Sequence, residues 1–243
     1  MHQPRKLGQL VGYGLQARDG EIGSLEEIFF DDDQWTVRYF VVRTGGWLLG
    51  RRVLVVPSVV TSVDEENKRL NVELTRGQVE ACPRVDTQLP ISRQYELQYY
   101  QYYGWEPYWA GDPLLAPRPH TEKVERRAGR KPEHSHLRSS KEVTGYRIHA
   151  RDGDIGHVVD FIVEEPEWTV RYLEVDTRNW LPGKRVLIGT PWISHVEWQN
   201  GLVNVDLLRE AIQTAPPYDP AKVIGRDYQA ALYKHYGMKC REA

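Results

Sequence analysis

The 243-residue sequence has few cysteines and no marked excess of charge of either sign. Cys82 and Cys240 are the only thiols, and no Cys-x-x-Cys pair occurs, so neither a disulfide framework nor a zinc ribbon is expected. The formal net charge of −2 excludes a surface that is basic overall. No run of about 18 apolar residues occurs, so we expect no transmembrane helix and a cytoplasmic protein.

One pattern is present twice in the chain. Residues 12–105 align with residues 145–238 at a constant offset of 133 without a gap, and about a third of the aligned positions are identical. The agreement is best in ARDGEIG and ARDGDIG, and in the WTVRY segment of each copy. The sequence therefore predicts two domains, 1–105 and 142–243, joined by a linker at 106–141.

Within each copy the short apolar runs are rich in Val, Ile, Tyr, Trp and Thr, which is typical of strands. Asp19-Gly20 and Asp152-Gly153 predict hairpin turns, because both residue types tolerate positive φ. Later strands are expected at 52–57, 59–63 and 69–74 and at the equivalent positions of the second copy. Helices are expected only at the end of each copy, at 76–81 and 92–103 in the first. The fold class is therefore mainly β, with two small antiparallel barrels, each followed by short helices.

The identities that the two copies share offer no catalytic group of the usual kinds. None of them is His, Cys, Ser, Lys or Glu, and Asp19/Asp152 and Asp86/Asp219 supply the only shared carboxylates. Since a site carried by each copy would repeat its reactive groups, we expect no enzyme, no cofactor and no metal. An asymmetric catalytic site between the copies is the alternative.

The sequence resembles the PRC-barrel family in four features. These are the hairpin with the DGEIG tip, the acidic turns at Asp31–Asp33 and Glu164–Glu165, the WTVRYFVV strand, and the RRVLVVP and KRVLIGT strands. That family includes the cytoplasmic domain of the photosynthetic reaction-centre H subunit, a domain of a bacterial ribosome-maturation protein, and bacterial proteins with tandem modules. The resemblance covers about residues 7–80 and 140–213. It implies barrels used for docking and assembly, without family-wide catalytic residues.

Arginines and tryptophans shared by the copies are candidates for partner contacts. Arg38 and Arg171 can pair with carboxylates of a partner, although internal pairing with acidic residues such as Asp31 or Glu164 is the favoured interpretation. Trp47 and Trp180 fall in expected loops, where an exposed aromatic ring can anchor a partner.

Other aromatic residues occur in one copy only. Four of them are also candidate contact residues: Tyr99, Tyr102, Trp105 and Trp109. Packing between the barrels is the first interpretation of this group, and a partner-binding patch or a platform for nucleic-acid bases are the alternatives.

The linker carries a basic segment, with eight basic and three acidic side chains from Arg118 to Lys141. The sequence thus predicts a non-catalytic scaffold that docks a protein partner, with the two modules arranged as a dimer fused in one chain. An RNA- or ribosome-associated factor that uses linker residues 118–141 is the main alternative. An assembly factor related to photosynthetic reaction centres is another.

Overall fold

A computed structural model describes residues 4–83, 93–108, 137–177 and 184–237. The fold is mainly β, as the sequence predicts, and both repeats place six strands in the same order. The first repeat contributes β2 (Gly14–Ala17), β3 (Gly20–Asp31), β4 (Thr36–Thr44), β5 (Arg52–Val55), β6 (Val60–Asp64) and β7 (Arg69–Val72). The second contributes β9 (Arg147–Ala150), β10 (Gly153–Glu164), β11 (Thr169–Asp176), β12 (Arg185–Gly189), β13 (Ile193–Glu197) and β14 (Leu202–Val205).

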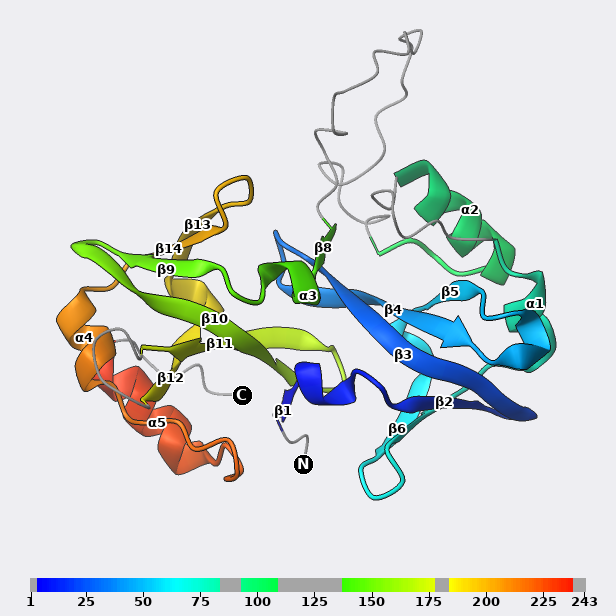
Figure 1. Cartoon of the computed structure of the whole chain (residues 1–243), viewed down its shortest axis with the longest axis horizontal. Coiled ribbons are helices and arrows are strands. Elements are labelled where there is room, and N and C mark those ends of the chain that lie inside the picture. The colour runs from blue at the N-terminus through cyan, green and yellow to red at the C-terminus, as the bar shows by residue number, and fades with distance from the viewer. Residues whose placement is uncertain (1–3, 84–92, 109–136, 178–183, 238–243) are drawn as a thin grey trace, which may run out of the picture.

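These strands form one sheet rather than two closed barrels (Figure 1). Its main path runs β13-β14-β9-β10-β11-β4-β3-β2-β7-β6, with β5 and β12 attached to β4 and β11. Within the described ranges no ladder joins β5 to β6 or β12 to β13, because the 3-10 turns η3 (Pro57–Val59) and η4 (Thr190–Trp192) redirect the chain there. The prediction of two small antiparallel barrels is therefore not confirmed: the sheet is not closed, and β2 pairs with β7, and β9 with β14, in parallel.

The shared DG-x-IG motif forms a hairpin tip and a tight crossing of two strands. A Cβ on Gly23 would lie 2.0 Å from the carbonyl oxygen of Arg43, and one on Gly156 would lie 2.2 Å from that of Asp176. The aspartate of each tip holds the helix that follows the repeat. Asp19 and Asp152 accept hydrogen bonds, each of 2.8 Å, from the backbone N–H groups of Arg76 and Arg209. Only glycine fits the crossing, and the shared aspartates have a structural role.

Short helices follow each repeat and lie at opposite ends of the molecule (Figure 1). They are α1 (Arg76–Ala81) and α2 (Arg93–Tyr103) in the first repeat, and α4 (Arg209–Thr214) and α5 (Arg226–His235) in the second. Helix α1 begins with a capping box, in which Thr75 and Gln78 satisfy each other's backbone N–H groups. The structure confirms the two helices expected in the first repeat. None of the helices in the described segments has the length and apolar composition needed to cross a membrane.

Each repeat is completed by a strand that precedes the other repeat. Strand β1 (Arg5–Lys6) pairs with β10 of the second repeat, and β8 (Leu137–Ser139) pairs with β3 of the first. Helix α3 (Ser140–Val143) follows β8 directly. The end of the predicted linker is therefore corrected, because residues 137–141 belong to folded elements. Residues 109–136 lie outside the described residues.

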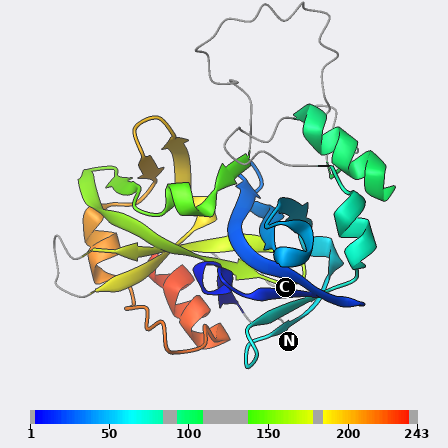
Figure 2. The same cartoon turned by 45° about the vertical axis from the view of Figure 1, so that its right-hand side comes forward.

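The hydrophobic core is continuous across the two repeats. Phe30 packs against Phe161 with ring centroids 5.3 Å apart, and Phe40 meets the edge of Trp168 at 5.1 Å. In the turned view, the blue-to-cyan first repeat and the green-to-orange second repeat meet along this seam (Figure 2). The seam is therefore an internal packing interface, with the character of a single core rather than of two domains in loose contact.

Candidate interaction site at the junction of the repeats

The two repeats meet around a pseudo-twofold axis. Thr36 of β4 lies opposite Thr169 of β11, and these are equivalent positions of the repeat. The flanking hydrogen bonds are also equivalent: the Val37 N–H donates to the Trp168 carbonyl (2.9 Å), and the Val170 N–H donates to the Trp35 carbonyl (2.6 Å). This reciprocal pairing is that of an isologous dimer interface within one chain.

Both tryptophans at this contact have a left-handed backbone, with φ of 54° at Trp35 and 55° at Trp168. A bulky residue in that region is strained, so surrounding contacts must hold it there. The ring of Trp168 is buried, while Trp35 is half-buried and stacks on Phe30 with centroids 5.5 Å apart. Trp35 thus packs on Phe30 and Trp168 on Phe40, and these contacts support the axis.

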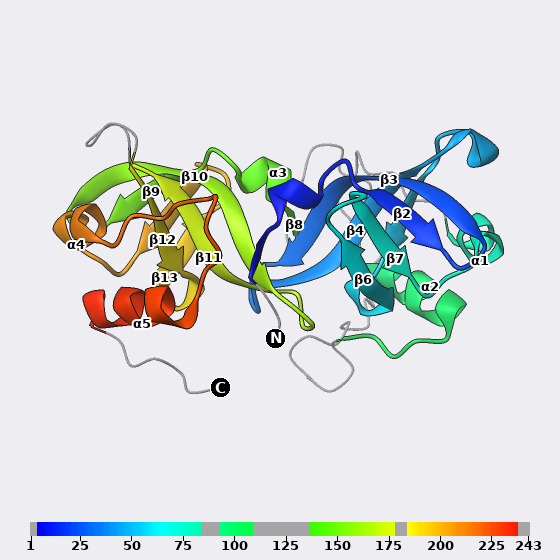
Figure 3. The same ribbon diagram turned by 90° about the horizontal axis from the view of Figure 1, so that it is seen from below.

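A cavity of about 340 Å³ opens on the axis, beside η1 (Gly8–Leu10), α3, β3 and β10. These elements lie together at the centre of the molecule when it is seen from below (Figure 3). The lining includes four pairs of equivalent positions, namely Gly8 and Lys141, Val11 and Thr144, Glu26 and Val159, and Glu27 and Asp160. Both repeats therefore build the cavity, but with different side chains.

The carboxylates around the cavity accept hydrogen bonds from the protein itself. Asp160 accepts from the backbone N–H groups of Gly8 and Phe161, both at 2.8 Å, and burial raises the pKa of Asp160 above its usual value. Glu27 accepts a hydrogen bond from the hydroxyl of Ser139. The bonds from Gly8 and Ser139 tie η1 and β8 to the walls of the cavity.

Glu26, also at the cavity, forms a charged cluster with two arginines. Arg52 and Arg43 both donate to its carboxylate at 2.7 Å. These bonds, that of Arg52 above all, lower the pKa of Glu26 to about 2. The equivalent position in the second repeat is Val159, so this ionic cluster belongs to one wall of the cavity only.

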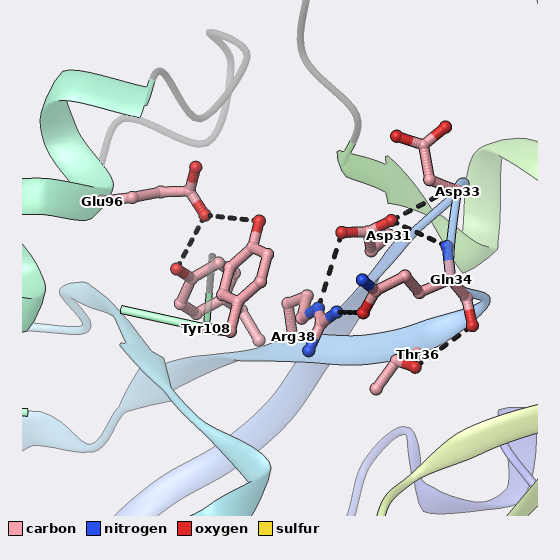
Figure 4. A network of polar contacts seen from close by, with 8 residues as sticks. Asp31, Asp33, Gln34, Thr36, Arg38, Glu96 and Tyr108 are labelled. Carbon is pink, nitrogen blue, oxygen red and sulfur yellow. Dashed lines mark hydrogen bonds and ion pairs between the residues drawn. The ribbon is translucent and has the colours of Figure 1, made fainter. Parts of the chain in front are cut away.

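A second polar network lies around Arg38 (Figure 4). The Arg38 guanidinium stacks on the ring of Tyr108 at 3.9 Å and forms an ion pair with Asp31 at 3.6 Å. The buried carboxylate of Glu96 accepts hydrogen bonds from the hydroxyls of Tyr39 (2.8 Å) and Tyr108 (3.3 Å). Burial and the neighbouring Glu96 raise the pKa of Tyr39 well above its usual value. Arg38 thus has internal partners, as the favoured interpretation of the shared arginines predicts.

Among the described residues, one group of carboxylates is close enough to hold a metal ion: Asp31, Asp32 and Asp33. Asp31 accepts hydrogen bonds from the N–H groups of Asp33 (2.9 Å) and Gln34 (3.0 Å), which closes the turn between β3 and β4. Asp32 pairs with Arg138 of β8 at 2.9 Å. The side chains of Asp31 and Asp32 therefore have structural roles, in the turn and at the junction.

Two of the other predicted contact residues have internal partners as well. Arg171 pairs with Glu164 at 2.7 Å, although its side chain is 45% exposed. The indole N–H of Trp47 donates to the carbonyl of Ile22 at 2.9 Å, and the guanidinium of Arg76 lies 4.2 Å from the centre of the indole. Trp47 is therefore half-buried and fixed in place rather than presented at a loop tip.

The aromatic residues of α2 pack on the first repeat. Tyr99 is fully buried and donates to the carbonyl of Leu54 at 3.0 Å, so it is not available to a partner. Trp105 stacks on Tyr103 with centroids 4.3 Å apart, whereas Tyr102 is 40% exposed. All of these contacts are within the first repeat and none is with the second. Trp109, Trp180 and linker residues 118–136 lie outside the described residues.

A buried ionic cluster at the junction was not expected from the sequence. Lys6 of β1 reaches Glu174 of β11 at 2.6 Å, and Arg185 of β12 reaches the other carboxylate oxygen of Glu174 at 2.6 Å. Glu174 is fully buried. The sequence did carry a signal, because the residue equivalent to Glu174 in the other copy is the apolar Val41.

Comparison with known proteins identifies one region of the chain. No curated protein matches the sequence. A protein-family model, the PRC-barrel domain, matches residues 7–79, which is less than a third of the chain and runs from η1 to α1. The first repeat therefore contains a PRC-barrel domain.

Proposed function

We propose that the protein is a non-catalytic scaffold of two PRC-barrel modules that docks a protein partner at the junction between them. The second module would span about residues 140–213. Its support is the equivalence of the repeats: the strand order is the same, the positions of the positive-φ tryptophans coincide, and each tip aspartate binds its own helix.

The observation that carries the proposal is the cavity on the axis. It is the place where the two modules together build a surface that neither has alone. Val11 at this cavity is 46% exposed, and the wall beside it carries carboxylates. An apolar contact next to polar groups is the arrangement of a protein interaction site.

The charge of the cavity disfavours RNA as its occupant. Glu26, Glu27 and Asp160 line it, and Lys141 is the one cation among its described lining residues. Phosphate groups would be repelled by such a lining. Binding of RNA through the basic linker is a separate hypothesis, which the same experiment can distinguish.

Affinity capture with the full-length chain tests the proposal. Val11→Glu adds a charge at the cavity, and Val223→Glu is the matched control because Val223 is also exposed (65%) but does not line the cavity. We expect the wild type and the control to retain the same protein partner after ribonuclease treatment, and Val11→Glu to lose it. Equal retention by both variants, no retained protein, or loss of the partner on ribonuclease treatment would refute the proposal.

A further inference from the structure

The strands that cross between the repeats have the same backbone geometry at both junctions. Arg5 and Lys6 of β1 face Val163 and Ile162 of β10. At the equivalent positions, Arg138 and Ser139 of β8 face Phe30 and Phe29 of β3. The backbone alone would therefore allow either crossing strand to complete either repeat.

The side chains at the two junctions differ. Under β1, the Lys6 ammonium lies 2.6 Å from the carboxylate of Glu174; the Lys6 side chain is 11% exposed and that of Glu174 is 0% exposed. Under β8, the residue equivalent to Lys6 is Ser139, and the one equivalent to Glu174 is Val41, which is buried in the core. One junction requires a cation from its crossing strand and the other does not.

We infer that the Lys6–Glu174 pair sets the pairing specificity of the repeats, so that the N-terminal half (the chain before the linker) and the C-terminal half (the chain after it) bind each other in preference to copies of themselves. This inference does not depend on the proposed docking of a partner. It assigns an interaction surface, the β10 edge with Glu174 beneath it, whose partner is an extended strand with a basic side chain at the Lys6 position.

The preference for mixed pairs follows from what happens to Glu174 when two like halves pair. If two C-terminal halves paired, Ser139 would lie where Lys6 lies, and the buried carboxylate would lose one of its two cations. A buried charge without its partner is strongly destabilising, because no water replaces the lost contact. Pairs of N-terminal halves are disfavoured indirectly. Cleavage gives equal numbers of the two halves, so each pair of N-terminal halves leaves two C-terminal halves that can pair only with each other.

The experiment uses the full chain with a protease recognition sequence inserted within residues 109–136. After cleavage, partial unfolding and refolding, native mass spectrometry counts the pairs of halves. We expect the wild type to give almost only pairs of one N-terminal and one C-terminal half. The variant Lys6→Ser with Glu174→Val copies the chemistry of the other junction, and should lower the ratio of mixed pairs to pairs of C-terminal halves by roughly 100-fold.

The control variant is Arg151→Gln with Asp206→Asn. It removes an ion pair of the second repeat whose side chains are about 60% exposed, and it should leave the preference for mixed pairs unchanged. Scrambling of the cleaved wild type into like pairs, or its separation into single halves, would overturn the inference. Retention of the wild-type preference by the double variant at the junction would overturn it as well. The result for the wild type can refute the inference by itself. The test therefore remains decisive even if the double variant fails to fold.

Discussion

The two junctions of the molecule share a backbone but differ in chemistry. At the first, β8 crosses onto β3 over an apolar Val41; at the second, β1 crosses onto β10 over a buried Glu174 that binds Lys6 and Arg185. The residues that fix the strand crossings and turns are those that the repeats share. The residues that distinguish one junction from the other differ between the two repeats. The shared residues thus determine the architecture, and the residues that differ at the junctions determine which halves of the chain pair with each other.

The largest expected effect comes from the shared glycines, where the repeats should respond alike. Gly23→Ala and Gly156→Ala each place a methyl group within 2.0 to 2.2 Å of a carbonyl oxygen on the neighbouring strand. We expect each to lower the free energy of unfolding by about 4 kcal/mol, measured by urea denaturation.

Gly46→Ala is the control for these variants, since nothing lies within 4 Å of its added methyl group. It should change the free energy of unfolding by less than about 0.5 kcal/mol. A clear difference between Gly23→Ala and Gly156→Ala would show that the repeats are not equivalent at their strand crossings.

The next effect should separate the two junctions. Lys6→Met leaves Glu174 buried with Arg185 as its remaining cation, and we expect a loss of about 3 kcal/mol in the free energy of unfolding. Ser139→Ala, at the equivalent position, removes a hydrogen bond to Glu27 and should cost about 1 kcal/mol. Urea denaturation of both variants gives the comparison, and equal losses would contradict the difference in chemistry.

Trp47→Phe should have a smaller effect, confined to the first repeat. The phenyl ring keeps the packing but loses the N–H that donates to Ile22, so a loss of about 1 kcal/mol is expected in thermal or urea unfolding. Partner binding should be unchanged, because Trp47 is held by internal contacts and does not line the cavity. Loss of a partner without loss of stability would restore Trp47 as a contact residue.

The smallest effect is a pH dependence at Glu26, a position occupied in the second repeat by the apolar Val159. The folded pKa of Glu26 is about 2, below its usual 4.5, so its ion pairs stabilise the fold fully above pH 4.5. That contribution is lost as the pH falls towards 2. Glu26→Gln should therefore be less stable than the wild type at pH 6, by under about 1 kcal/mol because the group is partly exposed, and equally stable near pH 2. A difference that grows on acidification would have the wrong sign.

The sequence predicted the local structure because local signals determine it. Asp-Gly marked the hairpin tips, and the shared WTVRY segments marked the two strands that meet at Thr36 and Thr169. Internal pairing of the shared arginines with acidic residues such as Asp31 or Glu164 was the favoured interpretation, and Arg38 and Arg171 do form such pairs.

The junction could not be predicted in the same way, because it depends on contacts between residues distant in the sequence. Strands β1 and β8 have two and three residues, too few to give a periodic pattern. In addition, β1 precedes the first repeat but pairs with the second, and β8 precedes the second repeat but pairs with the first. The sequence did not predict that the sheet stays open, because the pattern of apolar residues does not indicate whether β5 and β6 pair. The role of Glu174 depends on Lys6, which lies before the aligned repeat.

The arrangement of the repeats around the Thr36–Thr169 contact is tested most directly by a disulfide. These residues form a non-hydrogen-bonded antiparallel pair, a site where Cα atoms lie about 4.5 Å apart, within the range that a disulfide can bridge. We expect Thr36→Cys with Thr169→Cys to form an intramolecular disulfide on mild oxidation of the folded chain, identified by peptide mapping with mass spectrometry. Failure to form it, or its formation only between separate chains, would contradict the reciprocal pairing of the two repeats.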